Sequence, residues 1–378
     1  MINIVEKSKC SGCGACSQVC KNSCIKMIAD EQGFVYPSVN LKTCTNCKLC
    51  EKVCPVINTS AKRIPINTVA AINLNEKERL TSSSGGIFVA LAKNILSQGG
   101  VVFGALFNEK WEVYHDYVVN KDKLYLLQGS KYVQSMTGNS FVDVLKFLKE
   151  GRKVMYSGTP CQISGLNKFL NKKYDNLLLV EVVCHGVPSP LVWQEYLKTI
   201  NPQSINFRDK RLGWKNFSLS ISKDDYEPHN ENLFMRGFLS NLTLRPSCFA
   251  CNQKAGSSGC DLSIADFWGV NTVYPEIDDD KGVSLVLIYT NKGRDHIQSI
   301  PIFSYESDYN LVVKLNTTIE NNVIKPKEYN NFWRLFAGEG LIAIEKSLKK
   351  MRPNIIMKLH RSIKFKIKFY FNKLISIH

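Results

Sequence analysis

The segments CSGCGACSQVC (residues 10–20) and CTNCKLCEKVC (residues 44–54) repeat one spacing of four cysteines, with the second copy displaced by 34 residues. A cubane iron–sulfur cluster takes four thiolates, and a C-x2-C-x2-C loop supplies three of them while the fourth comes from the other copy. We therefore expect two 4Fe-4S clusters with crossed ligands. The first is assigned to Cys10, Cys13, Cys16 and Cys54, and the second to Cys44, Cys47, Cys50 and Cys20.

A pair of zinc sites is the alternative for these eight cysteines. Zinc ribbons separate two C-x2-C knuckles by a dozen or more residues, whereas here four thiols fall within eleven residues. This spacing favours clusters. Cys24 lies outside both loops, and we expect it to be a small buried packing residue rather than a ligand.

The chain has 378 residues and 14 cysteines, with 44% hydrophobic and 22% charged residues, which excludes a disordered chain. Its first nine residues, MINIVEKSK, lack the apolar stretch of an export signal. No apolar run approaches the roughly 20 residues of a membrane-spanning helix. We therefore expect a cytoplasmic protein whose thiols stay reduced, so that metal ligation is favoured over disulfides.

The formal net charge is +16, and residues 343–378 contribute ten Lys and Arg against Glu345 alone. The tail therefore contributes +9, and the rest of the chain keeps only +7. A nucleic-acid-binding body would carry basic residues interleaved with aromatics over a continuous face, so this modest charge argues against nucleic acid as a partner. Within the basic tail, helical spacing from Ile355 to Leu374 predicts a helix. That helix could contact an anionic membrane surface or pack on its own domain, while the alternation at 363–369 also permits a strand.

Composition divides the chain into a cysteine-rich module at 1–62, an α/β domain at 63–340 and the basic tail at 341–378, with a polar, proline-bounded linker at 57–65. Strands are predicted at 68–72, 101–107, 153–156, 177–183 and 283–290. Helices are predicted from residue 87 to the Gly99-Gly100 pair and at 141–149, 162–170 and 191–200. This alternation indicates a mixed α/β domain with at least partly parallel pairing. We expect 213–280 to carry loops over the sheet.

Four of the remaining cysteines form a second candidate set. Cys161 follows a predicted strand and opens a helix, Cys184 ends another strand, and Cys248 and Cys251 form a C-x2-C pair in a polar loop. Ligands at strand ends meet at one edge of an α/β sheet. These four could bind a third 4Fe-4S cluster or a structural zinc, or could be unconnected buried thiols, and Cys260 is a rival fourth ligand.

Residues 82–86, SSSGG, open a predicted helix, where backbone amides could cradle a phosphate or a serine could simply cap the helix. The basic residues Arg208, Lys210, Arg211 and Lys215 could also hold phosphates or form a solvated face. His185 beside Cys184 could be a proton donor or a hydrogen-bonded structural residue.

Several motifs together resemble the beta subunits of coenzyme F420 hydrogenases and dehydrogenases, in the form that carries an N-terminal two-cluster 4Fe-4S ferredoxin domain. Beyond the duplicated cysteines, they are SSGG at 83–86, GSKYVQS at 129–135, GTPCQ at 158–162, VCHGVPSP at 183–190, FRDK at 207–210 with Gly213-Trp214, RPSCFAC at 245–251 and ADFWG at 265–269. The resemblance covers most of the chain up to about residue 302.

The resemblance implies an FAD-dependent iron–sulfur oxidoreductase with a two-cluster ferredoxin module followed by a mixed α/β flavin-binding domain. Electrons would pass between the flavin, which exchanges a hydride with F420 or another two-electron carrier, and the clusters. By the same resemblance, Ser84, Gly85, Gly86, Lys131 and Tyr132 are candidates for the flavin or substrate face, and Cys161, Cys184, Cys248 and Cys251 for the additional cluster.

The implied partners are an electron-transfer protein or a two-electron carrier. Because proteins resembling this chain also occur beside polysaccharide-modifying enzymes, a partner enzyme of polysaccharide modification is a second option. The alternative function is accordingly a non-catalytic electron-transfer or accessory module of polysaccharide biosynthesis, which would need clusters but no flavin.

Overall fold

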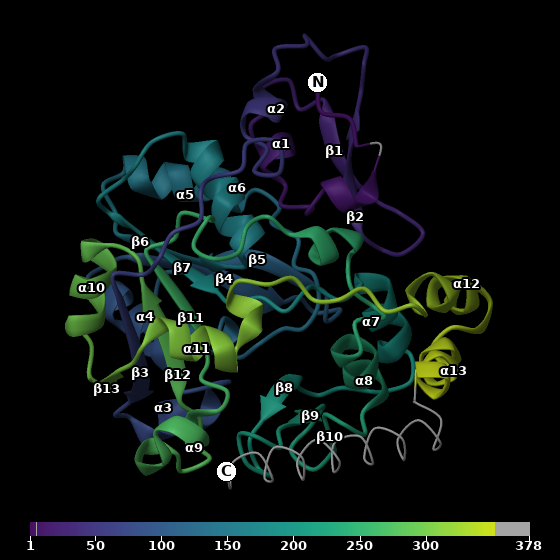
Figure 1. Ribbon diagram of the computed structural model, residues 1–378. Helices are drawn as coiled ribbons and strands as arrows, with labels where there is room; N and C mark the ends of the chain where they lie inside the picture. Colours follow the sequence, from purple (N-terminus) through teal and green to yellow (C-terminus); the bar gives the residue numbers. More distant parts are fainter. Residues whose placement is uncertain (5, 352–378) are drawn as a thin grey trace, which may run out of the picture.

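The centre of the computed structural model, which describes residues 1–4 and 6–351, is an eight-stranded sheet of order β13-β3-β12-β11-β7-β6-β4-β5 (Figure 1). In that order the strands are Ile302–Glu306, Asn67–Asn73, Ser284–Ile288, Leu262–Asp266, Leu177–Val182, Val154–Gly158, Val101–Phe107 and Val113–Val118. β11, β7, β6 and β4 pair in parallel, and the remaining neighbours pair antiparallel. The sheet is therefore mixed, as the sequence predicts.

Both faces of the sheet are buried because successive strand residues point to opposite sides. In β4, Val101 and Phe103 belong to one core and Val102 to the other. The helices on the first face are α5 (Ser140–Lys149), α6 (Pro160–Leu170) and α11 (Tyr309–Leu315), and those on the second are α4 (Ile87–Ser97) and α10 (Asn291–Gln298). The five predicted strands and the four predicted helices of the α/β domain are confirmed to within a few residues at each end.

Residues 213–280 differ from the expectation of loops alone. They contain β11 in the main sheet, and β9 (Ser218–Ser220) and β10 (Tyr226–Pro228), which join β8 (Asn206–Asp209) in a three-stranded antiparallel sheet. β11 reads LSIAD, and its polar Ser263 is buried because its hydroxyl donates to Glu181 of the neighbouring β7 at 2.7 Å. A short strand of this composition has little apolar signal, so the sequence did not identify it.

A third core lies beside the main sheet. It is built from the small sheet and from the helices α7 (Pro190–Leu197), α8 (Leu233–Leu239), α12 (Tyr329–Glu339) and α13 (Ile342–Met351). Ala343 and Ile344 of α13 are fully buried in it. The part of the predicted tail that could contact a membrane, including 355–374, lies outside the described residues. Shorter helices complete the fold at α3 (Glu76–Thr81) and α9 (Val270–Val273).

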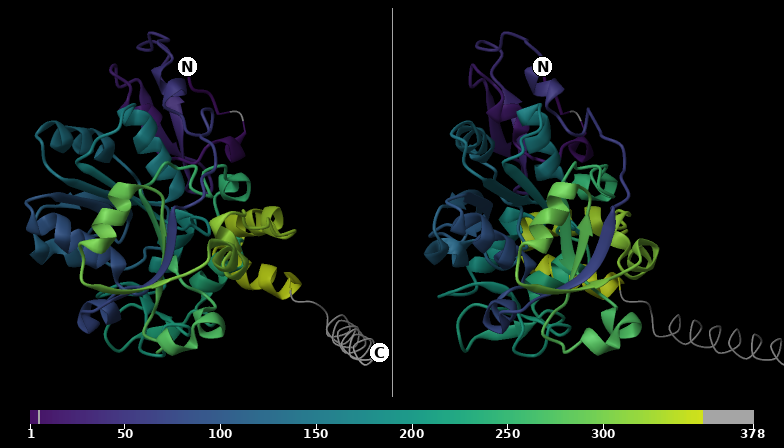
Figure 2. Two further views of the ribbon diagram at one scale, coloured as in Figure 1. Left: turned by 60° about the vertical axis from the view of Figure 1, so that its left-hand side comes forward. Right: turned by 90° about the vertical axis from the view of Figure 1, so that its left-hand side faces the viewer.

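The N-terminal module projects from one end of the α/β domain (Figure 2). It has two strands, β1 (Ile25–Ala29) and β2 (Val35–Val39), and two short helices, α1 (Ala15–Gln18) and α2 (Leu49–Lys52), which begin and end at equivalent positions of the two cysteine copies. The copies also share left-handed backbone at Gly12 and Asn46, and at Gly14 and Lys48. Glycine and asparagine adopt this conformation readily, whereas for a lysine it costs about 1 kcal/mol. The sequence duplication is therefore also a structural one.

The module is fixed to the domain by a buried arginine and a buried aromatic ring. Arg245, which is fully buried, donates to the carbonyl oxygens of Cys10 and Val35 in the module and to Gln134 in the domain, at 2.8 to 2.9 Å. Phe34, also fully buried, belongs to the third core. Among the described residues, no helix is both long enough and apolar enough to cross a membrane.

Candidate functional site

Cys54 of the second copy lies with the first three cysteines of the first copy. Burial is the main cause that raises the pKa of Cys16 to about 12, and the neighbouring thiols of Cys10 and Cys54 act in the same direction. The pKa of Cys13 is raised by burial and by Cys16, Cys161 and Cys54. Cys54 is thus a neighbour of the first copy's cysteines, as the crossed assignment requires, and Cys50 of the second set adjoins Cys16 and Cys54 as well. The crossed ligation itself stays a prediction.

The second set lies at the outer end of the module. Cys20 and Cys44 pack against the small core that contains Cys50. The backbone N–H of Ile2 donates to the Cys50 sulfur at 3.2 Å, and Cys47 is exposed. Cys47 is the exposed thiol among the eight predicted ligands, whereas Cys50 is buried and Cys20 and Cys44 are half-buried, like Cys10 and Cys54 of the first set.

Cys24 is buried, as expected, but it also contacts the second set. Its sulfur lies 3.2 Å from that of Cys20, and the pKa of Cys24 is raised to about 12 by the hydrogen bond with Cys20, by burial and by Cys44. Cys24 therefore contacts Cys20 and lies beside Cys44, two predicted ligands of the second cluster.

The four cysteines of the α/β domain line one small cavity of about 40 Å³. Cys161 lies in the first turn of α6, where Thr159 and Gln162 form a capping box, and Cys184 follows β7. Cys248 lies in the 3-10 helix Pro246–Ala250, and Cys251 ends it. Burial raises the pKa of Cys248 to about 11 and that of Cys251 to about 12.

Cys260 does not line this cavity. It is fully buried, with its sulfur 3.4 Å from the Ser263 hydroxyl, in a separate polar cluster with Glu181. The structure thus groups Cys251, not Cys260, with Cys161, Cys184 and Cys248. Among the described residues, no group of three or more His, Cys, Asp or Glu lies close enough to hold a single metal ion.

A second, larger cavity of about 680 Å³ opens beside the small one at the carboxyl ends of the parallel strands. It is lined by Ser84, Gly86, Lys131 and Tyr132 of the predicted cofactor residues. Gly85 does not line it: a Cβ there would lie 2.4 Å from the Ala71 carbonyl oxygen, so this glycine is required by the packing of the loop on the sheet.

The serines at 82–86 hold the cavity wall rather than cap α4. Gly86 precedes α4 with left-handed backbone, and no side chain caps this helix. Ser83 instead accepts hydrogen bonds from the backbone N–H and the hydroxyl of Ser130 at 2.8 and 2.9 Å, and Ser84 donates to the Val283 carbonyl at 3.0 Å. The start of α4, residues 86–89, lines the cavity, where the positive end of the helix dipole favours an anion.

Two lysines are held by backbone carbonyls around this loop. The Lys131 ammonium donates to the carbonyls of Leu126, Gln128 and Gly129, and burial lowers its pKa to about 7. Lys210 donates to the Ser84 carbonyl at 2.6 Å, and its pKa is also lowered to about 7 by burial. Both groups tie backbone carbonyls together, Lys131 in the cavity wall and Lys210 behind the loop of Ser84.

Arg208 is a buried cavity residue that forms an ion pair with Asp266. Its guanidinium forms a two-pronged ion pair with Asp266 at 2.6 and 3.2 Å and donates to the Tyr132 hydroxyl at 3.2 Å. It is 3% exposed, and its Nε has no hydrogen-bond partner in the described structure. An unpaired buried N–H is costly, so this donor points to a ligand that would accept it. Of the other basic residues predicted here, Lys215 lines the cavity and Arg211 pairs with Asp209 outside it.

His115 is a cavity residue that the sequence did not single out. Its Nδ1 lies 2.6 Å from the Ser135 hydroxyl and its Nε2 lies 3.1 Å from the Ser157 carbonyl, and burial lowers its pKa to about 4. His115 is therefore neutral at pH 7. His185 lies in both cavities with its Nε2 2.7 Å from the Asn241 side chain.

The two cavities share a wall. Cys161 and Cys184 line both of them, and Ser11 of the module also lies in both. Cys161 in turn adjoins Cys13, because a Cβ on Gly165, one turn further along α6, would lie 3.0 Å from the Cys13 sulfur. Cys13 also lines the large cavity directly. We call Cys10, Cys13, Cys16 and Cys54 the inner set and Cys20, Cys44, Cys47 and Cys50 the outer set; the inner set adjoins the cavities of the α/β domain.

Two segments of the chain match models of known families. Residues 151–302 match the C-terminal region of the coenzyme F420 hydrogenase/dehydrogenase beta chain, and residues 9–58 match a 4Fe-4S dicluster domain. The resemblance inferred from the sequence motifs is confirmed over these two segments.

Curated relatives match about half of the chain. An F420H2 dehydrogenase component of Methanosarcina mazei is 23% identical over 54% of this chain and 61% of its own length. The coenzyme F420-dependent sulfite reductase of Methanocaldococcus jannaschii is 29% identical over 51% of this chain and 30% of its own length. The chain therefore spans less than two thirds of these relatives. A chain of the F420-reducing NiFe hydrogenase complex of Methanosarcina barkeri superposes with a TM-score of 0.46 at 14% identity, covering 76% of this chain and 92% of that one.

Proposed function

We propose, from the match of residues 151–302 to the F420 hydrogenase/dehydrogenase beta subunits and of residues 9–58 to dicluster domains, that the chain is an iron–sulfur flavoprotein oxidoreductase. It would hold FAD in the large cavity, a third 4Fe-4S cluster in the small cavity and two clusters in the module. The observation that carries the proposal is the shared wall, in which Cys161 and Cys184 border both cavities.

The residues of the large cavity fit a flavin dinucleotide. A volume of about 680 Å³ is within the range of cofactor sites. The start of α4 suits its phosphates, and the unpaired Nε of Arg208 suits a carbonyl or phosphate oxygen. Lys131 and Lys210 donate to three backbone carbonyls each, so their role is to hold the surrounding loops in place. A bound flavin supplies the conversion between hydride transfer and single-electron transfer.

The protein's own groups position the reactants and keep the wall rigid. Ser83 and Ser130 join the two loops of the cavity, and the ion pair of Arg208 with Asp266 fixes the Tyr132 hydroxyl. His115, neutral and hydrogen-bonded at both ring nitrogens, adds polarity without charge. The two relatives are named for coenzyme F420, so F420 is the first candidate for the two-electron carrier.

The test is the flavin released per chain from protein purified without oxygen. A value near one supports the oxidoreductase and justifies assays with reduced F420, nicotinamide and ferredoxin. A value near zero with intact clusters refutes it and favours the electron-transfer or accessory module.

The third cluster is tested separately by iron content. Cys161→Ser is expected to lose the iron of the α/β domain and keep the two clusters of the module. Cys260→Ser is the control, since Cys260 is a cysteine of the same domain, even more deeply buried than Cys161, that lies outside the small cavity. Equal iron in both variants would remove the third cluster from the proposal.

A further inference from the structure

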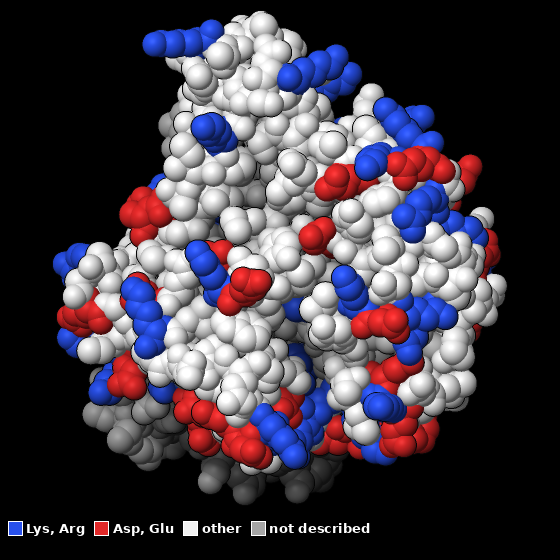
Figure 3. All heavy atoms as spheres, turned by 180° about the vertical axis from the view of Figure 1, so that it is seen from behind, with Lys and Arg blue, Asp and Glu red and all other residues white. Residues whose placement is uncertain are grey.

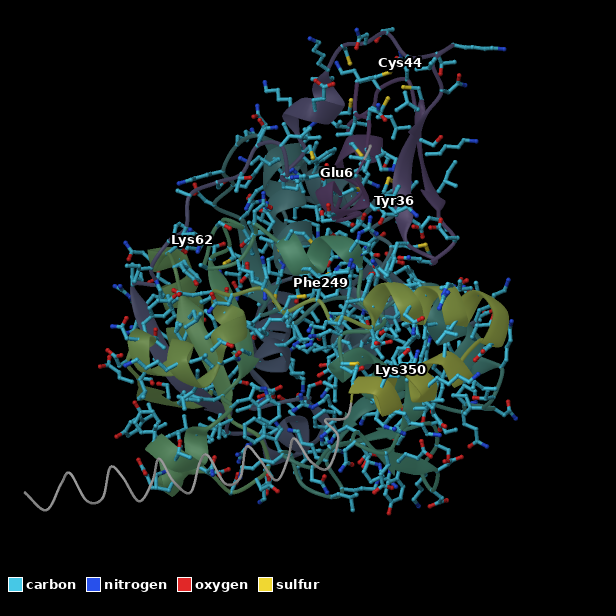
Figure 4. All side chains as sticks on the ribbon, turned by 45° about the vertical axis from the view of Figure 1, so that its right-hand side comes forward. Glu6, Tyr36, Cys44, Lys62, Phe249 and Lys350 are labelled. Atoms are coloured by element: carbon cyan, nitrogen blue, oxygen red, sulfur yellow. The ribbon has the colours of Figure 1, made fainter. Side chains whose placement is uncertain are left out.

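Charge is unevenly distributed within the N-terminal module. Segments 10–29 and 38–62 contain six lysines and one acidic residue, Glu51, whose carboxylate pairs with the Met1 ammonium at 2.5 Å. The acidic Asp30 and Glu31 both pair with Lys7 and lie on the turn that precedes the buried Phe34. The fourth acidic residue of the module, Glu6, lies nearer to the α/β domain than Cys44 does (Figure 4). The negative side chains therefore lie toward the domain or pair with a cation, and the opposite end of the module is left basic.

We define the basic tip as Lys21, Lys42, Lys48 and Lys52 together with Leu41 and Cys47. All six are exposed, and Leu41 retains 65% of its accessible surface. The side chain of Asn22 donates to the Thr43 carbonyl at 3.2 Å, which joins the segment of Lys21 to that of Lys42. Lys48 and Lys52 flank Cys50 on α2.

The figures agree with this distribution. Cys44 lies at the end of the module farthest from the α/β domain, whereas Tyr36 lies nearer to it (Figure 4). Seen from behind, the top of the projecting module shows Lys and Arg side chains and no acidic ones, while the body below shows both signs (Figure 3).

The outer cluster set is the one that reaches this surface. Cys47, one of its predicted ligands, is exposed at the basic tip, whereas Cys13 and Cys16 of the inner set are buried. Electrons that reach the outer cluster would therefore leave or enter the protein here.

The chemistry of the tip favours an acidic protein over other anionic surfaces. Segments 10–29 and 38–62 contain no Phe, Tyr or Trp on which nucleic-acid bases could stack. The local helix α2 has only four residues, too few for the long apolar face of a membrane-surface helix. The exposed Leu41 and the exposed lysines of the tip instead suit a small, transient contact with a protein surface that carries carboxylates around an apolar patch.

We propose that the basic tip is the docking surface for an acidic one-electron carrier protein that exchanges electrons with the outer cluster. The inference rests on the proposed function for its electron traffic, but docking itself requires no flavin. In each exchange one electron leaves the outer cluster and one enters the iron–sulfur centre of the carrier, or the reverse, and no covalent bond changes. Complementary charge would raise the association rate by about 10-fold to 1,000-fold at low salt.

The experiment measures binding of an acidic plant-type 2Fe-2S ferredoxin to the full chain, by calorimetry at low and at high salt. The test variant reverses three lysines of the tip, Lys21→Glu, Lys42→Glu and Lys52→Glu, none of which lies inside a C-x2-C-x2-C loop. The matched control makes the same change of charge at Lys327→Glu, Lys349→Glu and Lys350→Glu. These lysines are exposed at α12 and α13, and Lys350 lies far from Cys44 (Figure 4).

The expected result is a dissociation constant raised at least about tenfold by the tip variant and unchanged by the control, with the difference lost at high salt. Reduction of cytochrome c, which is basic, by the dithionite-reduced protein should change in the opposite sense and become faster in the tip variant. Equal affinity of the two variants, or no binding of ferredoxin to the wild-type chain at low salt, overturns the proposal. Binding of anionic vesicles or DNA that the tip variant alone loses, with ferredoxin affinity unchanged, also overturns it. Normal docking without electron transfer would instead refute the proposed redox function.

Discussion

Replacing Arg245 by methionine should loosen the contact between the module and the α/β domain. The fully buried guanidinium makes three hydrogen bonds of 2.8 to 2.9 Å and lies 4.3 Å from the centre of the Tyr36 ring. Methionine matches its length but donates nothing, so the carbonyls of Cys10 and Val35 and the Gln134 side chain lose their donors. Each unsatisfied acceptor costs about 1–3 kcal/mol, and the cation–π contact adds about 1 kcal/mol.

Part of this lost free energy is offset, because methionine carries no charge and the cost of burying a cation disappears. The net destabilisation of the contact should be about 3–5 kcal/mol, which raises the population of the undocked module by at least about 100-fold. The assay is limited proteolysis of the linker at 57–65, in parallel with denaturant unfolding followed by the visible absorbance of the clusters. The stability of Arg245→Lys and the rate at which its linker is cut should lie between those of Arg245→Met and wild type, since lysine keeps one donor group.

Arg334→Met is the control, because Arg334 is exposed and donates only to Asn331 of the same helix. If Arg245→Met unfolds within about 1 kcal/mol of wild type and its linker is cut no faster, the assignment of the contact to this arginine is refuted.

Three further predictions follow from individual side chains. Gly165→Ala places a Cβ 3.0 Å from the Cys13 sulfur and should lower the iron content of the inner cluster. Its control is Gly338→Ala on α12, where an added Cβ meets no described atom within 4 Å and should stabilise the fold by up to about 1 kcal/mol. Equal iron content and equal stability of the two variants would contradict the contact between α6 and Cys13. His115 has a folded pKa of about 4, below its ordinary value of 6.5, so the unfolded state binds more protons between these values and stability is lost as pH falls through this window. That loss should be about 2 kcal/mol between pH 7 and pH 5 in unfolding titrations and absent in His115→Gln, and an unchanged pH slope in the variant would exclude His115 as its source. Cys20→Ser should change the electron paramagnetic resonance signal of the outer cluster, and a change confined to the inner cluster would contradict crossed ligation.

The strands that the sequence located are those with strong apolar patterns. Val101–Phe107 was predicted with its observed bounds because it follows two glycines and is apolar on both faces. Leu262–Asp266 was not predicted, because its buried polar residue, Ser263, is satisfied by Glu181 of a strand 82 residues away and by Cys260. The local sequence pattern identifies a buried strand when its buried residues are apolar. It does not identify a strand whose buried polar residue is satisfied by hydrogen bonds to residues far away in the sequence.

In the candidate site too, some residues follow from local sequence position and others from the fold alone. The grouping of Cys161 with Cys184 could be argued from their positions at strand ends, since parallel strands end at one edge of a sheet. The choice between Cys251 and Cys260 could not, because both lie near one another in sequence and only the fold places Cys260 against Ser263. His115 was missed because a single histidine in a strand carries no spacing signal, and its partner Ser157 is 42 residues away.

The burial of Cys13 beneath α6 has a consequence for how the protein is assembled. Cys13 is 9% exposed and, together with Cys161, lines the large cavity of about 680 Å³ that we propose for the flavin. A bound flavin would therefore cover the side from which the inner set faces the α/β domain. Assembly should follow an order in which the inner cluster is inserted before the flavin occupies this cavity, whereas the outer cluster, with Cys47 at the surface, remains accessible in the finished protein.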